Sequence, residues 1–122
     1  MFTPEVKSIR PFVGSKDFET SRIFYTTMGF TETLISKDMC WLTMGDIGFY
    51  LQDYYVKKWM DNTMLFLEIE NLTDYRNFLI TQNITQIKGV RLSEINTEAW
   101  GHVFFVHDPA GVLWQIGNFI SA

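Results

Sequence analysis

Residues 98–116, EAWGHVFFVHDPAGVLWQI, predict two strands joined by a tight turn. The runs at 101–107 and 112–119 are rich in β-branched and aromatic residues, which is typical of strands. Between them, residues 108–111 place Asp first, Pro second and Gly fourth, as a type I turn requires. We therefore expect a β-hairpin near the end of the chain.

The chain before this hairpin contains the same order of elements twice. In the first half a strand is expected at 5–13, and a helix follows within 14–30. Ser15 or Asp17 can cap the start of that helix, and Gly29 can end it. Three strands are then expected at 30–36, 39–44 and 47–52.

Residues 53–62 connect the two halves, and the order then repeats. The second half predicts a strand at 63–70, a helix within 71–83 that Asn71 or Thr73 can cap, and strands at 87–95, 101–107 and 112–119. We expect one α+β domain over residues 1–122, built from βαβββ units at about 5–52 and 63–119. One face of each small sheet is covered by a helix, and the other faces can curve into a pocket.

The composition bounds the possible partners. A net charge of −4 argues against nucleic acid and anionic membranes, since both require a basic surface. No apolar run has the length of a membrane span, and the single cysteine, Cys40, allows no internal disulfide, so a cytoplasmic protein is expected. The chain has eleven Phe, five Tyr and four Trp, more than a small core needs, which indicates an aromatic cleft or interface.

Motifs for catalysis are lacking in the sequence. Cys40 lies in the apolar run MCWLTM, where a buried, inert thiol is expected. His102 and His107 are five residues apart on one expected strand, so they should point to opposite faces and cannot share one metal ion. The sequence shows no nucleophile motif and no phosphate-binding or dinucleotide-binding loop. It therefore favours binding over catalysis.

The paired βαβββ order, FYTTMGF at 24–30 and DPAG at 108–111 resemble the vicinal-oxygen-chelate superfamily, which contains glyoxalase I, extradiol dioxygenases and bleomycin resistance proteins. The resemblance is greatest to the bleomycin resistance proteins. It covers nearly the whole chain and also rests on Ser8 with Pro11, DNT at 61–63, SEI at 93–95 and AWG at 99–101.

This resemblance implies an incurved mixed sheet and a homodimer that exchanges part of its N-terminal strand region. The ligand clefts would lie between the subunits. Bleomycin resistance proteins are not catalytic: they sequester a cationic antibiotic and stack aromatic side chains on its flat tail. The metal-ligand positions of the superfamily's enzymes correspond here to Ser8, Leu51 or Gln52, Met64 and Gln115. Since none is a His or a carboxylate, we expect no metal and no other cofactor.

The same resemblance places the stacking tryptophan at Trp100 and its aromatic partner at Met39. Trp41 would share the strand face of Met39 and could take over part of its role. Glu68 could favour a cationic guest or pair with Arg10. The expected ligand-binding residues are Trp100, Met39, Trp41, Phe66, Glu68, Arg10, Gln115 and His102.

The expected function is metal-independent binding of a flat, cationic small molecule in a cleft at the dimer interface, as in drug sequestration. One alternative is a metal-dependent lyase of the glyoxalase type or a dioxygenase. Another is a member of the superfamily that binds a different metabolite.

Overall fold

Two separate sheets carry the expected repeat in the computed structural model, which describes residues 1–120. Sheet A comes from the first half and has the strand order β1-β4-β3-β2. Its strands β3 and β4 have the predicted bounds, and they form an antiparallel hairpin in which Trp41 lies opposite Tyr50. The elements of this half are β1 (Phe12–Gly14), α1 (Phe18–Met28), β2 (Thr31–Ser36), β3 (Met39–Met44) and β4 (Ile47–Gln52).

Sheet B comes from the second half, with the order β5-β9-β8-β6 and with β7 paired to β8. The predicted hairpin of β8 and β9 is confirmed, and the Gly111 amide donates to the Asp108 carbonyl across the turn. The elements are α2 (Lys57–Asp61), β5 (Met64–Glu68), α3 (Leu72–Thr81), a 3₁₀ turn η1 (Ile84–Gln86), β6 (Arg91–Leu92), β7 (Asn96–Glu98), β8 (Gly101–His107) and β9 (Leu113–Phe119).

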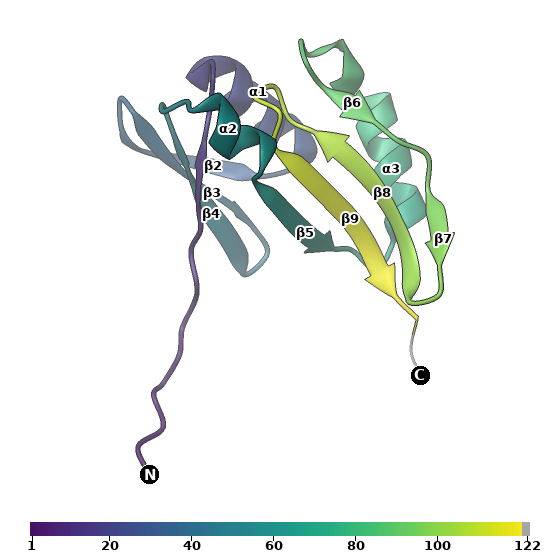
Figure 1. The fold of residues 1–122 in the computed structure, drawn as a ribbon, viewed down its shortest axis with the longest axis horizontal. Helices are drawn as coiled ribbons and strands as arrows, with labels where there is room; N and C mark the ends of the chain where they lie inside the picture. Colours follow the sequence, from purple (N-terminus) through teal and green to yellow (C-terminus); the bar gives the residue numbers. More distant parts are fainter. Residues whose placement is uncertain (121–122) are drawn as a thin grey trace.

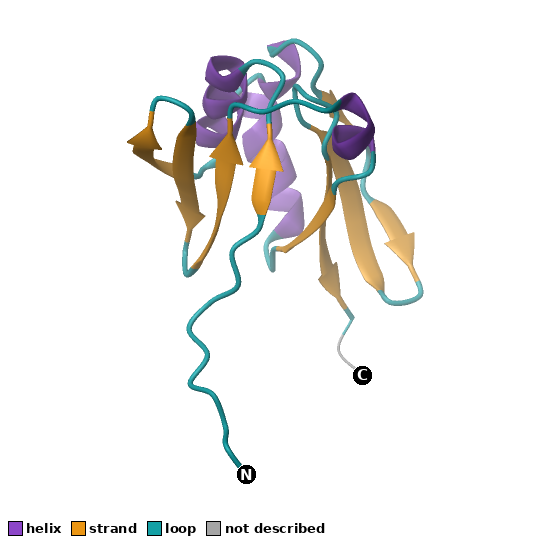
Figure 2. Ribbon diagram, turned by 60° about the vertical axis from the view of Figure 1, so that its left-hand side comes forward, coloured by secondary structure: helices purple, strands orange, loops and turns teal. Residues whose placement is uncertain are grey.

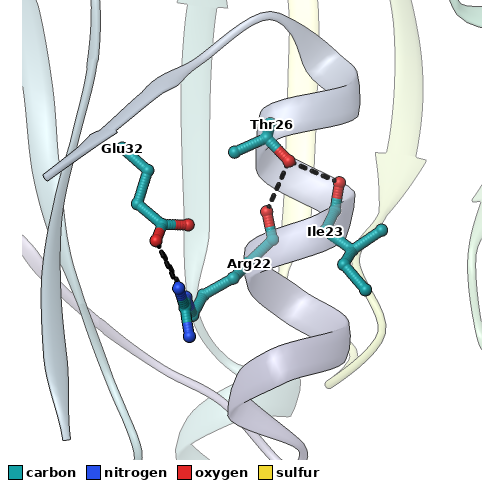
Figure 3. Close-up of polar contacts among 4 residues, drawn as sticks. All are labelled: Arg22, Ile23, Thr26 and Glu32. Atoms are coloured by element: carbon teal, nitrogen blue, oxygen red, sulfur yellow. Dashed lines mark hydrogen bonds and ion pairs between the residues drawn. The ribbon is translucent and has the colours of Figure 1, made fainter. Parts of the chain in front are cut away.

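Local chemistry sets the ends of α1 and fixes it to sheet A. The Asp17 carboxylate accepts a hydrogen bond from the Thr20 amide, and Gly29 ends the helix in the left-handed conformation with φ of 115°. The Arg22 guanidinium donates to the Glu32 carboxylate and thereby ties α1 to β2 (Figure 3). Asp17 is thus the cap among the two predicted, and the predicted end at Gly29 is confirmed.

The two sheets share one core, which contains the helices. The longer helices lie between the two groups of strands (Figure 2). Tyr25 of α1 packs against Phe49 of β4 at 5.0 Å between ring centroids and against Trp114 of β9 at 5.7 Å. Because one helical side chain contacts strands of both sheets, the two halves fold as one unit.

This core contains a buried network of hydrogen bonds around Tyr25 and Asp108. The Tyr25 hydroxyl donates to the Asp108 carboxylate at 2.5 Å and accepts from the Trp114 indole at 2.9 Å. The other Asp108 carboxylate oxygen accepts from the amides of Ala110 and Val112. Burial raises the pKa of Asp108 and raises that of Tyr25 well above its usual value. The Asp of the turn therefore joins the last hairpin to the first helix.

The predicted first strand is wrong over most of its length. Only Phe12–Gly14 pair with β4, while residues 1–11 run away from the body as an exposed segment that we call the arm (Figure 1). Pro11 has no amide hydrogen to donate to the ladder, although its carbonyl accepts from Tyr50. Pairing within the chain therefore stops at this proline.

The second half departs from the expected elements at two places. The connector contains the short helix α2, which has no side-chain cap to signal it. The predicted strand at 87–95 is reduced to Arg91–Leu92, because the chain turns at Gly89 with φ of 88°, and the separate strand β7 follows. On α3 the Phe78 side chain is exposed and stacks on Tyr75. Within residues 1–120 no helix has the length and apolar character needed to cross a membrane.

Candidate functional site

Each sheet has a covered face against the helices and a bare face without helices. On β5 the covered residue Leu67 is buried, whereas its neighbours Phe66 and Glu68 point the other way and are exposed. On β3 the same alternation buries Cys40 and leaves Trp41 half-buried on the bare face. The predicted sharing of one strand face by Met39 and Trp41 is therefore confirmed.

An aromatic cluster of Phe66, Trp100 and Phe119 lies on the bare face of sheet B; we call it cluster B. The Phe66 and Phe119 rings stack at 5.3 Å, and the Trp100 ring lies 5.9 Å from Phe66 and 5.5 Å from Phe119. Trp100 and Phe66 are each 40% exposed. Cluster B therefore presents apolar ring surface to an incoming molecule.

Two glycines make cluster B possible. At Gly101 a Cβ atom would lie 1.9 Å from the Asn118 carbonyl oxygen, so only glycine lets β8 start so close to β9 beside Trp100. At Gly117 a Cβ atom would lie 3.1 Å from the Phe66 ring and 2.5 Å from the His102 carbonyl oxygen. The absence of a side chain there leaves the space that the Phe66 ring occupies. The Trp100 backbone is also held, because its carbonyl accepts from the Ile120 amide.

A second group, which we call cluster A, lies on the bare face of sheet A and consists of Arg10, Phe12, Trp41 and Tyr50. Phe12 stacks on Tyr50 at 4.8 Å, and Trp41 lies 4.8 Å from the other side of the same residue. The Arg10 guanidinium sits 4.4 Å from the Trp41 ring centroid and donates to the Tyr50 hydroxyl at 2.8 Å. The Trp41 ring covers Gly48, where a Cβ atom would approach it to 2.6 Å.

Met39 lies one row further along sheet A, opposite Gln52. Met39 and Gln52 are both half-buried on the bare face. Leu51, the alternative to Gln52 for the metal-ligand position that the resemblance implies, is buried in the core. Gln52 also lines a cavity of about 400 Å³ beneath α2, together with Phe12, Gly14, Tyr54, Trp59, Met60 and Thr63. Trp59, on α2, therefore borders a hollow next to cluster A.

The superfamily's metal-ligand positions do not fit a metal in this chain. Gln115 and Met64 are neighbours on the bare face of sheet B, where the Gln115 amide donates to the Met64 sulfur at 2.8 Å. Gln52 lies on sheet A, and Ser8 lies on the exposed arm. Hydroxyl, thioether and amide groups supply no negative charge to offset the dehydration of a dication. Among residues 1–120, no three His, Cys, Asp or Glu side chains gather closely enough to hold an ion.

Glu68 lines a cavity of about 490 Å³ between the β3–β4 turn and β5, with Met44, Gly45, Ile47, Phe66, Leu67 and Ile69. Its expected alternative partner, Arg10, contacts Trp41 and Tyr50. The ion pairs of residues 1–120 join Arg22 to Glu32, Lys57 to Asp61 and Arg76 to Glu94. Glu68 is therefore exposed beside a mainly apolar hollow and has no ion-pair partner among residues 1–120.

The two histidines point to opposite faces, as predicted. His102 pairs with Asn118, and its ring lies 3.1 Å from the Thr97 hydroxyl on the helix side of sheet B. It borders a small hollow at the start of α3 and does not share a surface with Phe66 or Gln115. The structure thus separates His102 from the other expected ligand residues. His107 lies on the bare face beside Arg91, and burial together with that positive charge lowers its pKa.

Cys40 lies in the core, where burial raises the pKa of its thiol to about 11. This is the inert environment expected from the sequence.

Phe12, Tyr50 and Phe119 of the two clusters are absent from the expected set of ligand-binding residues. Phe119 continues the alternation of Leu113, Gln115 and Gly117 along β9, and that period could have revealed it. Tyr50 follows from the two-residue turn at 45–46, which fixes Trp41 opposite Tyr50.

The fold is shared with several solved structures at low sequence identity. A bleomycin resistance determinant encoded on the transposon Tn5 superposes with a TM-score of 0.81 at 18% identity, over 95% of this chain and 100% of that one. The bleomycin-binding protein from Streptomyces verticillus, complexed with copper(II)-bleomycin, gives 0.78 at 17% identity, over 97% and 100%. Lactoylglutathione lyase from Agrobacterium tumefaciens gives 0.69 at 10% identity, over 95% of each chain.

No protein-family model and no curated protein sequence matches the chain. The resemblance seen in the sequence is confirmed by the superposed structures as a likeness of fold. The chain has the vicinal-oxygen-chelate fold, the architecture of the bleomycin resistance proteins and of glyoxalase-family enzymes.

Proposed function

We propose that this protein binds a flat, cationic small molecule without metal or chemistry and sequesters it, as a bleomycin-resistance protein does. The bound molecule is bleomycin or another aromatic cation. Binding takes place in the cytoplasm, where the Cys40 thiol stays reduced, and nucleic acid and membranes are not partners.

The observation that carries this proposal is cluster B. Three aromatic rings gather on a sheet face that no helix covers, with Trp100 and Phe66 40% exposed. A flat ring system stacked there gains about 0.5–1.5 kcal/mol per aromatic pair beyond the burial of its surface. Glu68 lies two residues from Phe66 on the same face, so its carboxylate favours a positively charged guest. The fold shared with a protein that holds copper(II)-bleomycin supports this choice of ligand.

The geometry supports this assignment of the site residues. Trp100, Phe66 and Phe119 form the stacking surface, and Gln115 and Glu68 supply polar contacts. Trp41 and Met39 belong to the bare face of sheet A, a separate surface of the same chain.

We further propose that the cleft is completed in a homodimer, in which sheet A of one subunit faces sheet B of its partner and the arms are exchanged. The arm supports this because Phe2, Val6 and Ile9 are each more than 80% exposed in the single chain. Apolar side chains on an extended segment gain stability when a second chain covers them. Light scattering should give the mass of a dimer for the full chain and of a monomer after deletion of residues 1–9. A monomeric full chain would contradict this assembly.

The ligand proposal is tested by titrating metal-free bleomycin into the wild type, Trp100→Ala and Phe78→Ala, followed by tryptophan fluorescence and calorimetry. Phe78 is the matched control, because it is an aromatic of similar exposure, 42%, on the outer side of α3. We expect saturable binding at about one site per subunit, weakened at least tenfold by Trp100→Ala and unchanged by Phe78→Ala. Absence of binding, or equal binding by both variants, would refute bleomycin sequestration through cluster B.

A further inference from the structure

Arg10, at the end of the arm next to β1, places its guanidinium on the aromatic rings of cluster A. The Arg10 guanidinium lies 4.4 Å from the Trp41 centroid and 5.9 Å from that of Tyr50, and it donates to the Tyr50 hydroxyl at 2.8 Å. Phe12 stacks on the other side of Tyr50 at 4.8 Å. Two rings, from β3 and β4, therefore contact one planar cation, and Phe12 of β1 supports the Tyr50 ring.

The environment of the Arg10 guanidinium suits a planar, delocalised cation. A guanidinium is flat and delocalised, so it stacks on an indole face while its edge donates hydrogen bonds in the ring plane. The ion pairs of residues 1–120 do not include Arg10, so the charge is met by ring faces and a phenol oxygen. Any amidinium or guanidinium group of a ligand satisfies the same requirements.

We propose that Phe12, Trp41 and Tyr50 form a subsite for a planar, delocalised cation of the ligand, and that Arg10 occupies this subsite until a ligand displaces it. The inference rests on the proposed function and narrows its ligand class to flat compounds that bear an amidinium-like group. Arg10 thereby acts as an internal competitor.

Competition between Arg10 and the cation of a ligand determines which ligands this subsite prefers. A simple cation that replaces Arg10 exchanges one cation–π contact for another and gains little. A ligand whose ring system also stacks on aromatic surface gains a second interaction that Arg10 does not make. The Arg10 side chain can leave, because it is exposed and, among residues 1–120, makes no ion pair; it is held by ring contacts and the hydrogen bond to the Tyr50 hydroxyl. The subsite therefore favours ligands that combine a flat ring system with a delocalised charge.

Two fluorescent probes separate these contributions. Proflavine is a flat tricyclic ring with a delocalised amidinium-like cation, and acridine is the same ring system without the amino groups and uncharged at neutral pH. Each is titrated by fluorescence anisotropy against the wild type, Arg10→Ala, Lys7→Ala, Trp41→Ala and the double variant Arg10→Ala with Trp41→Ala. Lys7→Ala is the matched control, because it removes one positive charge from the same exposed arm without touching cluster A.

Arg10→Ala should bind proflavine about two- to fivefold more tightly than the wild type, which corresponds to one cation–π contact at an exposed site. Lys7→Ala should leave the affinity unchanged, the double variant should lose the gain, and acridine should gain less than proflavine. An Arg10→Ala variant that binds proflavine no more tightly than Lys7→Ala overturns the subsite, as does a gain that survives Trp41→Ala.

The same titrations on Trp100→Ala keep the two proposals apart. If Trp100→Ala weakens proflavine binding while Arg10→Ala has no effect, the subsite is overturned and sequestration stands. If Arg10→Ala tightens binding through Trp41 while Trp100→Ala has no effect, the subsite stands and the role of cluster B fails. If proflavine binds neither the wild type nor Arg10→Ala, the subsite is overturned, and sequestration is decided by the bleomycin titration.

Discussion

Trp114 and Trp100 lie fourteen residues apart in the same stretch of sequence, yet they occupy opposite environments. Trp114 is 3% exposed on the covered face of sheet B, and its indole donates to the Tyr25 hydroxyl. Trp100 is 40% exposed on the bare face, where it contacts Phe66 and Phe119. The same residue type thus stabilises the fold at one site and offers ring surface at the other.

The difference extends to the whole of each face. On the covered face the buried Asp108 carboxylate is paired with Tyr25 and two backbone amides. On the bare faces the aromatic rings, the Glu68 carboxylate and the Arg10 guanidinium are accessible. Substitutions on the covered face should therefore change stability, and those on the bare face should change binding.

Asp108→Ala should have the largest effect on stability. It leaves the Tyr25 hydroxyl and the amides of Ala110 and Val112 without their acceptor in a buried place. Each unmade buried hydrogen bond costs about 1–3 kcal/mol, so we expect a loss of at least about 3 kcal/mol. Urea unfolding followed by circular dichroism measures this loss. A loss below about 1 kcal/mol would mean that the network does not hold the two halves together.

Leu67→Ala and Phe66→Ala sharpen the contrast between the faces, because they are neighbours on β5 that point in opposite directions. Leu67 is 5% exposed, and its truncation should cost about 2–4 kcal/mol through the cavity that it leaves. Phe66→Ala should cost about 1 kcal/mol or less. Chemical unfolding of both variants tests the pair. Equal losses would show that Phe66 is needed for folding.

His107 gives the smallest expected effect, on the pH dependence of stability. Burial and the charge of Arg91 lower its pKa below the ordinary 6.5, so the folded state binds a proton less readily than the unfolded chain. Its contribution to stability is therefore complete above about pH 6.5 and is lost as the pH falls below that value. We expect His107→Gln to lose less stability than the wild type between about pH 8 and pH 5. Identical curves for the two proteins would rule out this contribution.

The sequence predicted the elements whose signals are local. Alternation and turn residues predicted β3, β4 and β8 with their observed bounds, and Asp17 and Gly29 marked the ends of α1. It failed where pairing depends on distant partners. Whether residues 5–11 form a strand depends on a neighbouring edge, and Pro11 ends the ladder within this chain.

The candidate site shows the same division. Alternation placed Phe66 and Glu68 on one strand face and Met39 and Trp41 on another, and the structure agrees. The assignment of His102 to the same surface failed, because a two-residue periodicity shows which residues share a face but not which face is bare. The contact of Arg10 with Trp41, in place of Glu68, joins residues far apart in the chain.

The sequence by itself therefore determined the main order of strands and helices and the turn at 108–111. These properties depend on residue type and short-range spacing. Only the tertiary structure decided which face of each sheet the helices cover, how Tyr25 joins the two halves through Asp108, and where the arm leaves the body. These depend on contacts between segments distant in sequence, which the pattern along the chain does not encode.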